Sequence, residues 1–338
     1  MKHVTRLLSI VVVLLLLAVP LSSVFAQTDQ NPLCNGLSTE DCDFIMSSQQ
    51  MVATATSFAI PAMDVSFNID DGSSNTAFAM KASGEVMLPE SGQFLLHLAL
   101  TDISMEPADP TVPSELEVLV NDTMGFINYK GEWYGQELSD KDKADLQDAL
   151  GQITGAMAMG GGDMGMGDMG IDLTGVITTT RNADVQEMGM NMASFSTSVD
   201  ITQLLVAVLS SPILGTLLGS GSADMGLGEL SPQDLQMMGM IFQPMLTGTT
   251  VDLQEWIGVD DMYLHKLVLD VNIHVDLGMF GSEGAAPITG AVHIDVSLDQ
   301  VNEMFDVTAP ESYKSMDELN MDAGGLDLGS LGSGLFGQ

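Results

Sequence analysis

A long run of alternating apolar and polar residues most constrains what this chain can fold into. In the second half of the stretch 251–277, one set of alternate positions is apolar and the other is mostly polar. The apolar positions are Leu267, Leu269, Val271, Ile273, Val275 and Leu277, and the polar ones are Lys266, Asp270, Asn272, His274 and Asp276. A strand with this period has one dry and one wet face, which indicates an antiparallel sheet covered on one side only.

The same alternation recurs along most of the chain. Further strands are predicted at 63–70, 78–86, 94–100, 116–120, 124–129, 195–201 and 292–298. Helices are predicted from Ser38, which starts a capping box, to about 57, and over 139–153, 204–218 and 231–246. The expected fold class is α+β: a curled antiparallel sheet of roughly ten strands, a half-open barrel with helices packed on its concave face.

The first 26 residues predict export. Lys2 and Arg6 precede an apolar run over 7–19, and Ala26 supplies a small residue at the end of this segment. The run is too short for a membrane span of about 20 residues. We expect a signal peptide over 1–26, and no cysteine follows it directly to carry a lipid anchor. The mature protein is expected to be soluble, and either secreted or in the cell envelope.

The charge of the chain excludes some classes of partner, and its two cysteines predict a disulfide. The chain has 46 acidic against 9 basic residues, and loss of Lys2 and Arg6 changes the net charge from −37 to −39. Such acidity opposes binding to nucleic acid and to anionic membrane surfaces, so we expect no nucleic-acid partner and only transient membrane contact. Cys34 and Cys42 lie close together, which in an exported protein predicts a disulfide rather than a metal site.

The mature sequence predicts one domain with two unusual segments. Residues 27–37 form an N-terminal segment, and the domain extends over 38–310. Within it, 155–170 reads GAMAMGGGDMGMGDMG, which lacks any helical or strand period and predicts a loop. From 311 to 338 the chain is rich in Gly, Asp and Ser, which predicts a disordered acidic tail.

The order of these parts carries a resemblance. A first helix, a strand meander, Gly131-Glu132-Trp133, central helices, Trp256-Ile257-Gly258 before a long strand, and a closing strand before 307–310 resemble the LolA-like superfamily. Within it, the chain is similar to the LppX/LprG-type envelope lipoproteins of bacteria, although it lacks their anchoring cysteine. The resemblance implies a half-open barrel whose apolar concave face holds lipid acyl chains, and it implies a role in carrying lipid across the cell envelope.

The candidate ligand site is the apolar side of the predicted strands. A large curled sheet cannot fill its own interior, so either a cavity or a plug of helices is required. The residues expected to line a cavity for a lipid or similar hydrophobic molecule are Met63, Val65, Phe67, Ile69, Met80, Leu96, Leu98, Leu269, Val271 and Ile273. The alternative is a closed core packed by the central helices, with a structural or interaction role. The loop 155–170 and the helices 204–218 and 231–246 are candidate gates.

Methionine supplies a rival function. The chain has 26 methionines, and thioethers select Cu(I). The candidate copper ligands are Met157, Met159, Met164, Met166 and Met169, and closely spaced methionines also occur at 188–192 and 237–240. Glycine patterns for phosphate or dinucleotide binding and the common hydrolase motifs do not occur. We therefore expect a monomeric binding protein with no enzymatic activity and no cofactor, and solvated histidines on the strands.

Overall fold

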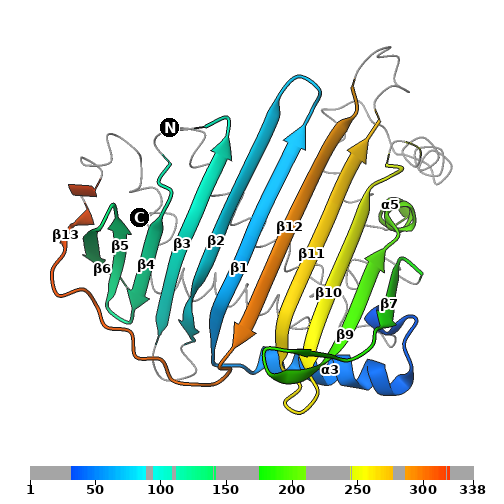
Figure 1. Ribbon diagram of the computed structural model, residues 1–338, viewed down its shortest axis with the longest axis horizontal. Coiled ribbons are helices and arrows are strands. Elements are labelled where there is room, and N and C mark those ends of the chain that lie inside the picture. The colour runs from blue at the N-terminus through cyan, green and yellow to red at the C-terminus, as the bar shows by residue number, and fades with distance from the viewer. Residues whose placement is uncertain are drawn as a thin grey trace.

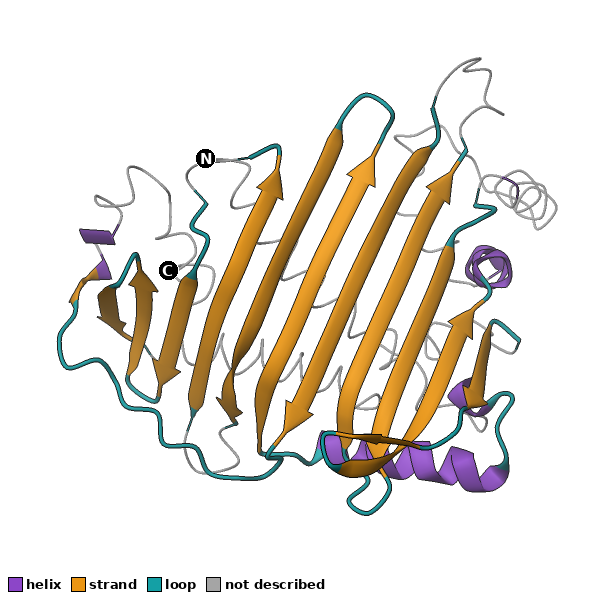
Figure 2. Cartoon of the chain, in the orientation of Figure 1, coloured by secondary structure: helices purple, strands orange, loops and turns teal. Residues whose placement is uncertain are grey.

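The computed structural model describes residues 32–88, 94–108, 112–139, 141, 175–210, 244, 246–276, 286–316 and 318–319. Figure 1 shows one large sheet seen face-on, and Figure 2 shows helices at one end of it. The strands are β1 (Ser57–Asp70), β2 (Asn75–Met87), β3 (Leu95–Glu106), β4 (Leu116–Asn121), β5 (Met124–Tyr129), β6 (Glu132–Glu137), β7 (Ile177–Arg181), β8 (Val185–Glu187), β9 (Met190–Val199), β10 (Thr250–Gly258), β11 (Leu264–Val275), β12 (Ile288–Asp299) and β13 (Lys314–Ser315). Preceding them or between them lie the 3-10 turn η1 (Pro32–Cys34) and the helices α3 (Thr39–Ala53) and α5 (Ile201–Ser210).

The sheet is open and joins two antiparallel halves. Its order is β13-β6-β5-β4-β3-β2-β1-β12-β11-β10-β9-β7, and β8 pairs with β9 outside this path. The first long strand, β1, pairs with the last long strand, β12, in the register Val65 opposite Ile294. Most neighbouring strands are antiparallel, and β13 lies parallel to β6. The curled, unclosed antiparallel sheet predicted from the alternation is therefore confirmed.

The N-terminal helix begins where its cap predicts. The Asp41 amide donates to Ser38 Oγ at 3.2 Å. The acidic residues Glu40 and Asp41 in the first turn stabilise the helix, because their negative charge interacts favourably with the helix dipole. The disulfide between Cys34 and Cys42, with 5.0 Å between its Cα atoms, ties η1 to this first turn. The capping serine and the disulfide are thus both confirmed. In Figure 1, α3 runs across the ends of β9, β10 and β11.

Several element boundaries differ from the sequence prediction. α3 ends at Ala53, not near 57, and β1 starts at Ser57, six residues before the predicted strand. The register between β1 and β2 shifts between Ile60 and Met63, around Pro61. A proline cannot donate to the sheet and is accommodated at such an irregularity, which also interrupts the alternation that the prediction relied on.

The long stretch near the C-terminus folds as a hairpin and a return strand. β10 and β11 pair over Thr250–Ile257, and β11 is 12 residues long, so the long one-sided strand is confirmed with its end at Val275. α5 starts three residues before the helix predicted at 204, where Asp200 accepts from the Gln203 amide. The predicted helices 139–153 and 231–246 and the loop 155–170 lie almost wholly outside the described residues.

The start of the predicted disordered tail is part of the sheet. Lys314 and Ser315 form β13 against β6, and the side chains of Met316 and Leu319 are buried. The segment leading there covers Phe126 and its neighbours with Phe305 and Val307. This part of the tail prediction is therefore wrong, because residues 311–319 contain no glycine and burial of their apolar side chains offsets the entropy of ordering them. Residues 320–338 lie outside the described part.

Candidate functional site

Strand register brings the predicted site residues onto one face. Residues directly opposite each other in antiparallel strands point to the same side of the sheet. Val65 lies opposite Met80 on one side and Ile294 on the other, and Ile294 lies opposite Leu269. The parallel rows on this apolar face hold the other predicted residues: Met63, Phe67, Ile69, Leu96, Leu98, Val271 and Ile273.

Exposure changes along this apolar face. Val65 is fully buried and Leu269 is 2% exposed, whereas Ile69 at the end of β1 is 43% exposed. Ile69 and Ile273 lie on either side of Gly290, which has no side chain to fill the space between them. Apolar surface is therefore buried deeply at the centre of the face and reaches solvent at this end.

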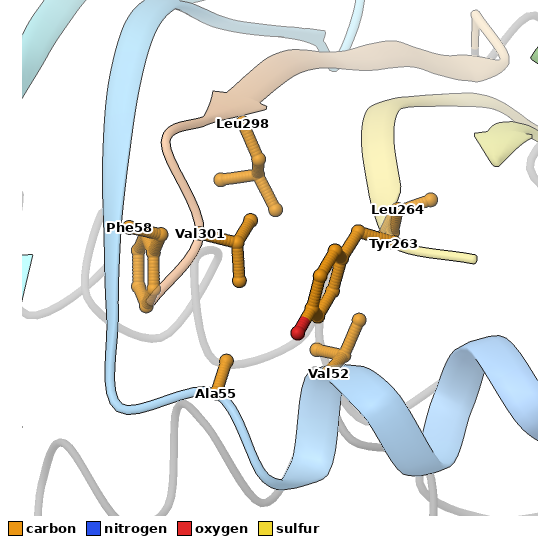
Figure 3. Close-up of a pocket in the computed structure, with 7 residues that line it drawn as sticks. All are labelled: Val52, Ala55, Phe58, Tyr263, Leu264, Leu298 and Val301. Carbon is orange, nitrogen blue, oxygen red and sulfur yellow. The ribbon is translucent and has the colours of Figure 1, made fainter. Parts of the chain in front are cut away.

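A small cavity lies under the C-terminal end of α3 (Figure 3). Its volume is about 20 Å³, which is room for one water molecule and far too little for an acyl chain. The lining side chains are almost entirely apolar: Val52, Ala55, Phe58, Tyr263, Leu264, Leu298 and Val301. None of the ten residues predicted from the sequence lines it, so this cavity is a packing feature between α3 and the sheet.

A buried carboxyl interrupts the apolar face. Glu255 of β10 lies opposite Leu267 of β11 and Phe195 of β9, and it is 4% exposed. Its Oε2 has no hydrogen-bond partner among the described residues. Burial away from water raises the pKa of Glu255 from 4.5 to about 7, because the charged form loses its hydration. Glu255 is not among the predicted site residues, although Val251, Leu253 and Ile257 alternate around it and mark its position as inward.

A pair of hydroxyls lies in the adjoining row. Thr197 is opposite Leu253, and its Oγ1 is 3.0 Å from Oγ1 of Thr179, with both side chains buried. The two hydroxyls thus share one hydrogen bond within the apolar layer, which lowers the cost of burying them there.

The nearby cation does not pair with Glu255. Arg181 lies opposite Phe195, and its guanidinium carbon is 4.9 Å from the centre of that ring. Its nitrogens contact Asp184 and, at 3.6 Å, Asp41. The guanidinium therefore contacts carboxylates of α3 and of the loop after β7, and the carboxyl of Glu255 has no partner among the described residues.

The opposite face of the sheet is polar. His97 lies 2.7 Å from Glu85 and 2.9 Å from Glu117. Burial favours its neutral form, but hydrogen bonds and charge attraction from Glu117 and Glu85 outweigh this effect and raise the pKa of His97. His293 similarly contacts Asp270 at 2.7 Å. These pairs fit the predicted wet face.

One histidine departs from the prediction. His265 is 3% exposed, with Nε2 2.8 Å from Asp261 and Nδ1 3.2 Å from the Leu298 carbonyl oxygen. The register between β10 and β11 shifts beside it, at Trp256 and Ile257. His265 has the same parity as the inward residues Leu267 and Leu269, which agrees with its burial. The prediction placed three of the four strand histidines on the wet face, and its preference for solvated histidines does not hold for His265.

The copper hypothesis concerns residues mostly outside the described part. Met157, Met159, Met164, Met166 and Met169 all lie there. Met192 is buried in β9, whereas Met188 is 42% exposed in the turn between β8 and β9, so these two do not share a strand face. Within the described ranges, no group of three His, Cys, Asp or Glu residues is arranged to hold a metal ion.

Solved structures match the chain at low sequence identity. LprF from Mycobacterium bovis matches 81% of this chain over 99% of its own, with 13% identity and a TM-score of 0.34. LppX from Mycobacterium tuberculosis matches 79% over 100%, with 10% identity and a TM-score of 0.28. A LolA superfamily protein from Nitrosomonas europaea matches 79% over 94%, with 7% identity and a TM-score of 0.18.

Sequence comparison adds no relatives. No family model matches the chain, and no curated protein matches it. Because these identities and TM-scores are low, the matches carry no argument about this chain, and its site and function are argued from its own geometry. Among the helices in its described part, none has the length and apolar character needed to cross a membrane.

Proposed function

We propose that this protein binds a lipid or another hydrophobic molecule on the apolar face of its sheet. The observation that carries the proposal is the continuity of this face across β3, β2, β1, β12, β11 and β10, in register and without a charged residue before Glu255. The apolar surface reaches solvent near Ile69, where a chain could enter.

The energetics favour such a ligand without special polar contacts. Each buried methylene contributes about 0.8 kcal/mol, so one long acyl chain contributes on the order of 10 kcal/mol before the costs of ordering it. Met63 and Met80 lie on this face, and methionine is flexible enough to pack against chains of different shape.

The N-terminal sequence indicates where such a lipid-binding protein would act. The signal-peptide features of residues 1–26 support an extracytoplasmic location, in a bacterial envelope or outside the cell. We propose a monomeric carrier or holder of lipid without catalytic activity.

Native mass spectrometry tests the proposal directly. The mature chain, 27–338, would be purified from its own host without detergent, and its mass measured before and after extraction with organic solvent. A bound mass in the lipid range that disappears on extraction supports the proposal. Protein without a bound molecule would contradict it, and a copper adduct that depends on residues 155–170 would support the rival function.

Two substitutions on β11 locate the ligand. Val271→Lys places a charge on the apolar face, and we expect it to abolish lipid retention. Val268→Lys is the matched control, because Val268 lies on the opposite face across from Asp295, where a lysine has a favourable partner. Equal lipid retention by two folded variants would show that this face is not the binding surface.

A further inference from the structure

Two buried polar atoms lack partners in the described part of the molecule. They are Oε2 of Glu255, on the apolar face of β10, and Nε2 of Gln49, on α3. Glu255 is 4% exposed and Gln49 is 8% exposed. A buried polar group without a hydrogen bond is destabilising, so such groups in a native protein call for a partner. Nε2 of Gln49 is a donor, and Oε2 of Glu255 is an acceptor whenever it does not carry the carboxyl proton.

The course of α3 places both residues in the same layer. Phe44 of α3 stacks on Phe195 of β9 with 6.2 Å between the ring centres, and Val52 lines a cavity with Leu264 of β11. These two contacts lie on either side of β10. Eight helical residues span about 12 Å, and two strand spacings span about 10 Å. The middle of the helix therefore crosses β10, as Figure 1 shows.

Gln49 lies on the side of α3 that faces this layer. It is buried together with Ile45 and Ser48, whereas Gln50 is exposed. Glu255 occupies the part of β10 that the helix crosses, because Phe195 is directly opposite Glu255 and Leu264 is opposite Ile257. The unpaired donor of Gln49 thus faces the apolar layer from α3, and the unpaired acceptor of Glu255 faces the same layer from β10.

We infer that Glu255 and Gln49 form a polar anchor for a hydroxyl group on an otherwise apolar ligand. A hydroxyl can donate one hydrogen bond and accept others, so it can donate to Oε2 of Glu255 and accept from Nε2 of Gln49. The ligand class is a long-chain molecule with a neutral hydroxyl-bearing head. This inference rests on the proposed function, because the chain of such a ligand would lie on the apolar face next to the anchor.

The chemistry of the site selects against other heads. Neighbouring Arg181 is held by Asp41 and Asp184, so a ligand carboxylate would meet Glu255 without a free cation. The hydroxyls of Thr179 and Thr197 hydrogen-bond to each other. A hydroxyl is therefore the group that fits the remaining donor and acceptor.

A matched pair of small ligands tests the anchor. 1-Dodecanol and 1-methoxydodecane share a twelve-carbon chain, but only the alcohol can donate a hydrogen bond. Each would be titrated into delipidated mature protein loaded with the neutral fluorophore diphenylhexatriene, and displacement would be followed by fluorescence. We expect the alcohol to bind about ten- to a hundredfold more tightly than the ether, as a hydrogen bond to a buried charged or polar group predicts.

Variants assign the preference to the two residues. Glu255→Leu and Gln49→Leu are each expected to reduce the preference for the alcohol to less than threefold while leaving the ether bound. Gln254→Leu and Gln50→Leu are the controls, because they are exposed neighbours on the same elements, and they are expected to keep the full preference.

The outcomes separate this inference from the proposed function. Equal binding of alcohol and ether by the wild-type protein would overturn the anchor and leave the lipid-binding proposal standing. Failure of both compounds to displace the fluorophore, or of the fluorophore to bind, would overturn both. An undiminished preference in Glu255→Leu would also overturn the anchor.

Discussion

The substitution Glu255→Gln is expected to make stability less dependent on pH. In the folded protein the carboxyl of Glu255 is buried, and its pKa is raised from 4.5 to about 7. The folded state therefore binds this proton more tightly than the unfolded state does. As pH rises from about 4.5 to about 7, the proton is lost at a growing cost to the folded state, so the free energy of unfolding falls and then levels off. Glutamine has nearly the same shape but does not ionise.

The size of the effect follows from the two pKa values. The gap between 4.5 and about 7, at about 1.4 kcal/mol for each pKa unit, gives a full cost of about 3 kcal/mol above pH 7. At about pH 5 roughly 1 kcal/mol of this cost is already present. The variant should therefore gain about 2 kcal/mol relative to the wild-type protein between pH 5 and pH 8.

Urea unfolding followed by circular dichroism measures this difference. Both proteins would be freed of bound lipid and unfolded at several pH values between 5 and 8, and the free energies of unfolding would be subtracted at each pH. Contributions from other groups cancel in the subtraction. Glu115→Gln is the control for the loss of an exposed carboxylate. Parallel profiles for wild type and Glu255→Gln would refute the burial of this carboxyl.

Three further substitutions test other parts of the fold. His97→Gln should destabilise the protein more at about pH 5.5 than at about pH 8.5. The raised pKa of His97 contributes stability below pH 6.5, and this stability is lost as pH rises through the folded pKa. Equal loss of unfolding free energy at the two pH values, measured by urea unfolding, would contradict this. Cys34→Ser should lower the free energy of unfolding by roughly 2–3 kcal/mol relative to the wild-type protein under oxidising conditions, because it removes the disulfide. As a control, reduction of the wild-type protein should lower the free energy of unfolding by the same amount. Ser38→Ala should cost about 1 kcal/mol in urea unfolding through loss of the helix cap, whereas Ser47→Ala within the helix should cost less.

Much of the strand content could be predicted because alternation is local. The side-chain period of a strand places Val65 and Leu269 on an inward face without knowledge of their partners. The ten residues predicted to line the site share one face for this reason. Where a proline and a register shift break the period, as at Pro61, the prediction failed in the strand boundary.

The anchor residues were missed although their signal was present. Glu255 occupies an inward position in an alternating series, and Gln49 lies four residues after Ile45 on the buried stripe of α3. A polar residue at such a position is either satisfied or functional, but the sequence does not show which. Only the crossing of α3 over β10 brings the two positions into one layer.

The sequence by itself determined the local properties of this protein: the strands, their apolar face, the helix cap and the close cysteine pair. These depend on periods and contacts within about ten residues. Tertiary structure alone decided the pairing of β1 with β12, the addition of β13 to β6, and the isolation of the Glu255 carboxyl from water. Strand pairing joins residues more than 200 positions apart, and burial depends on what lies on every side, so neither is encoded in any short stretch of the chain.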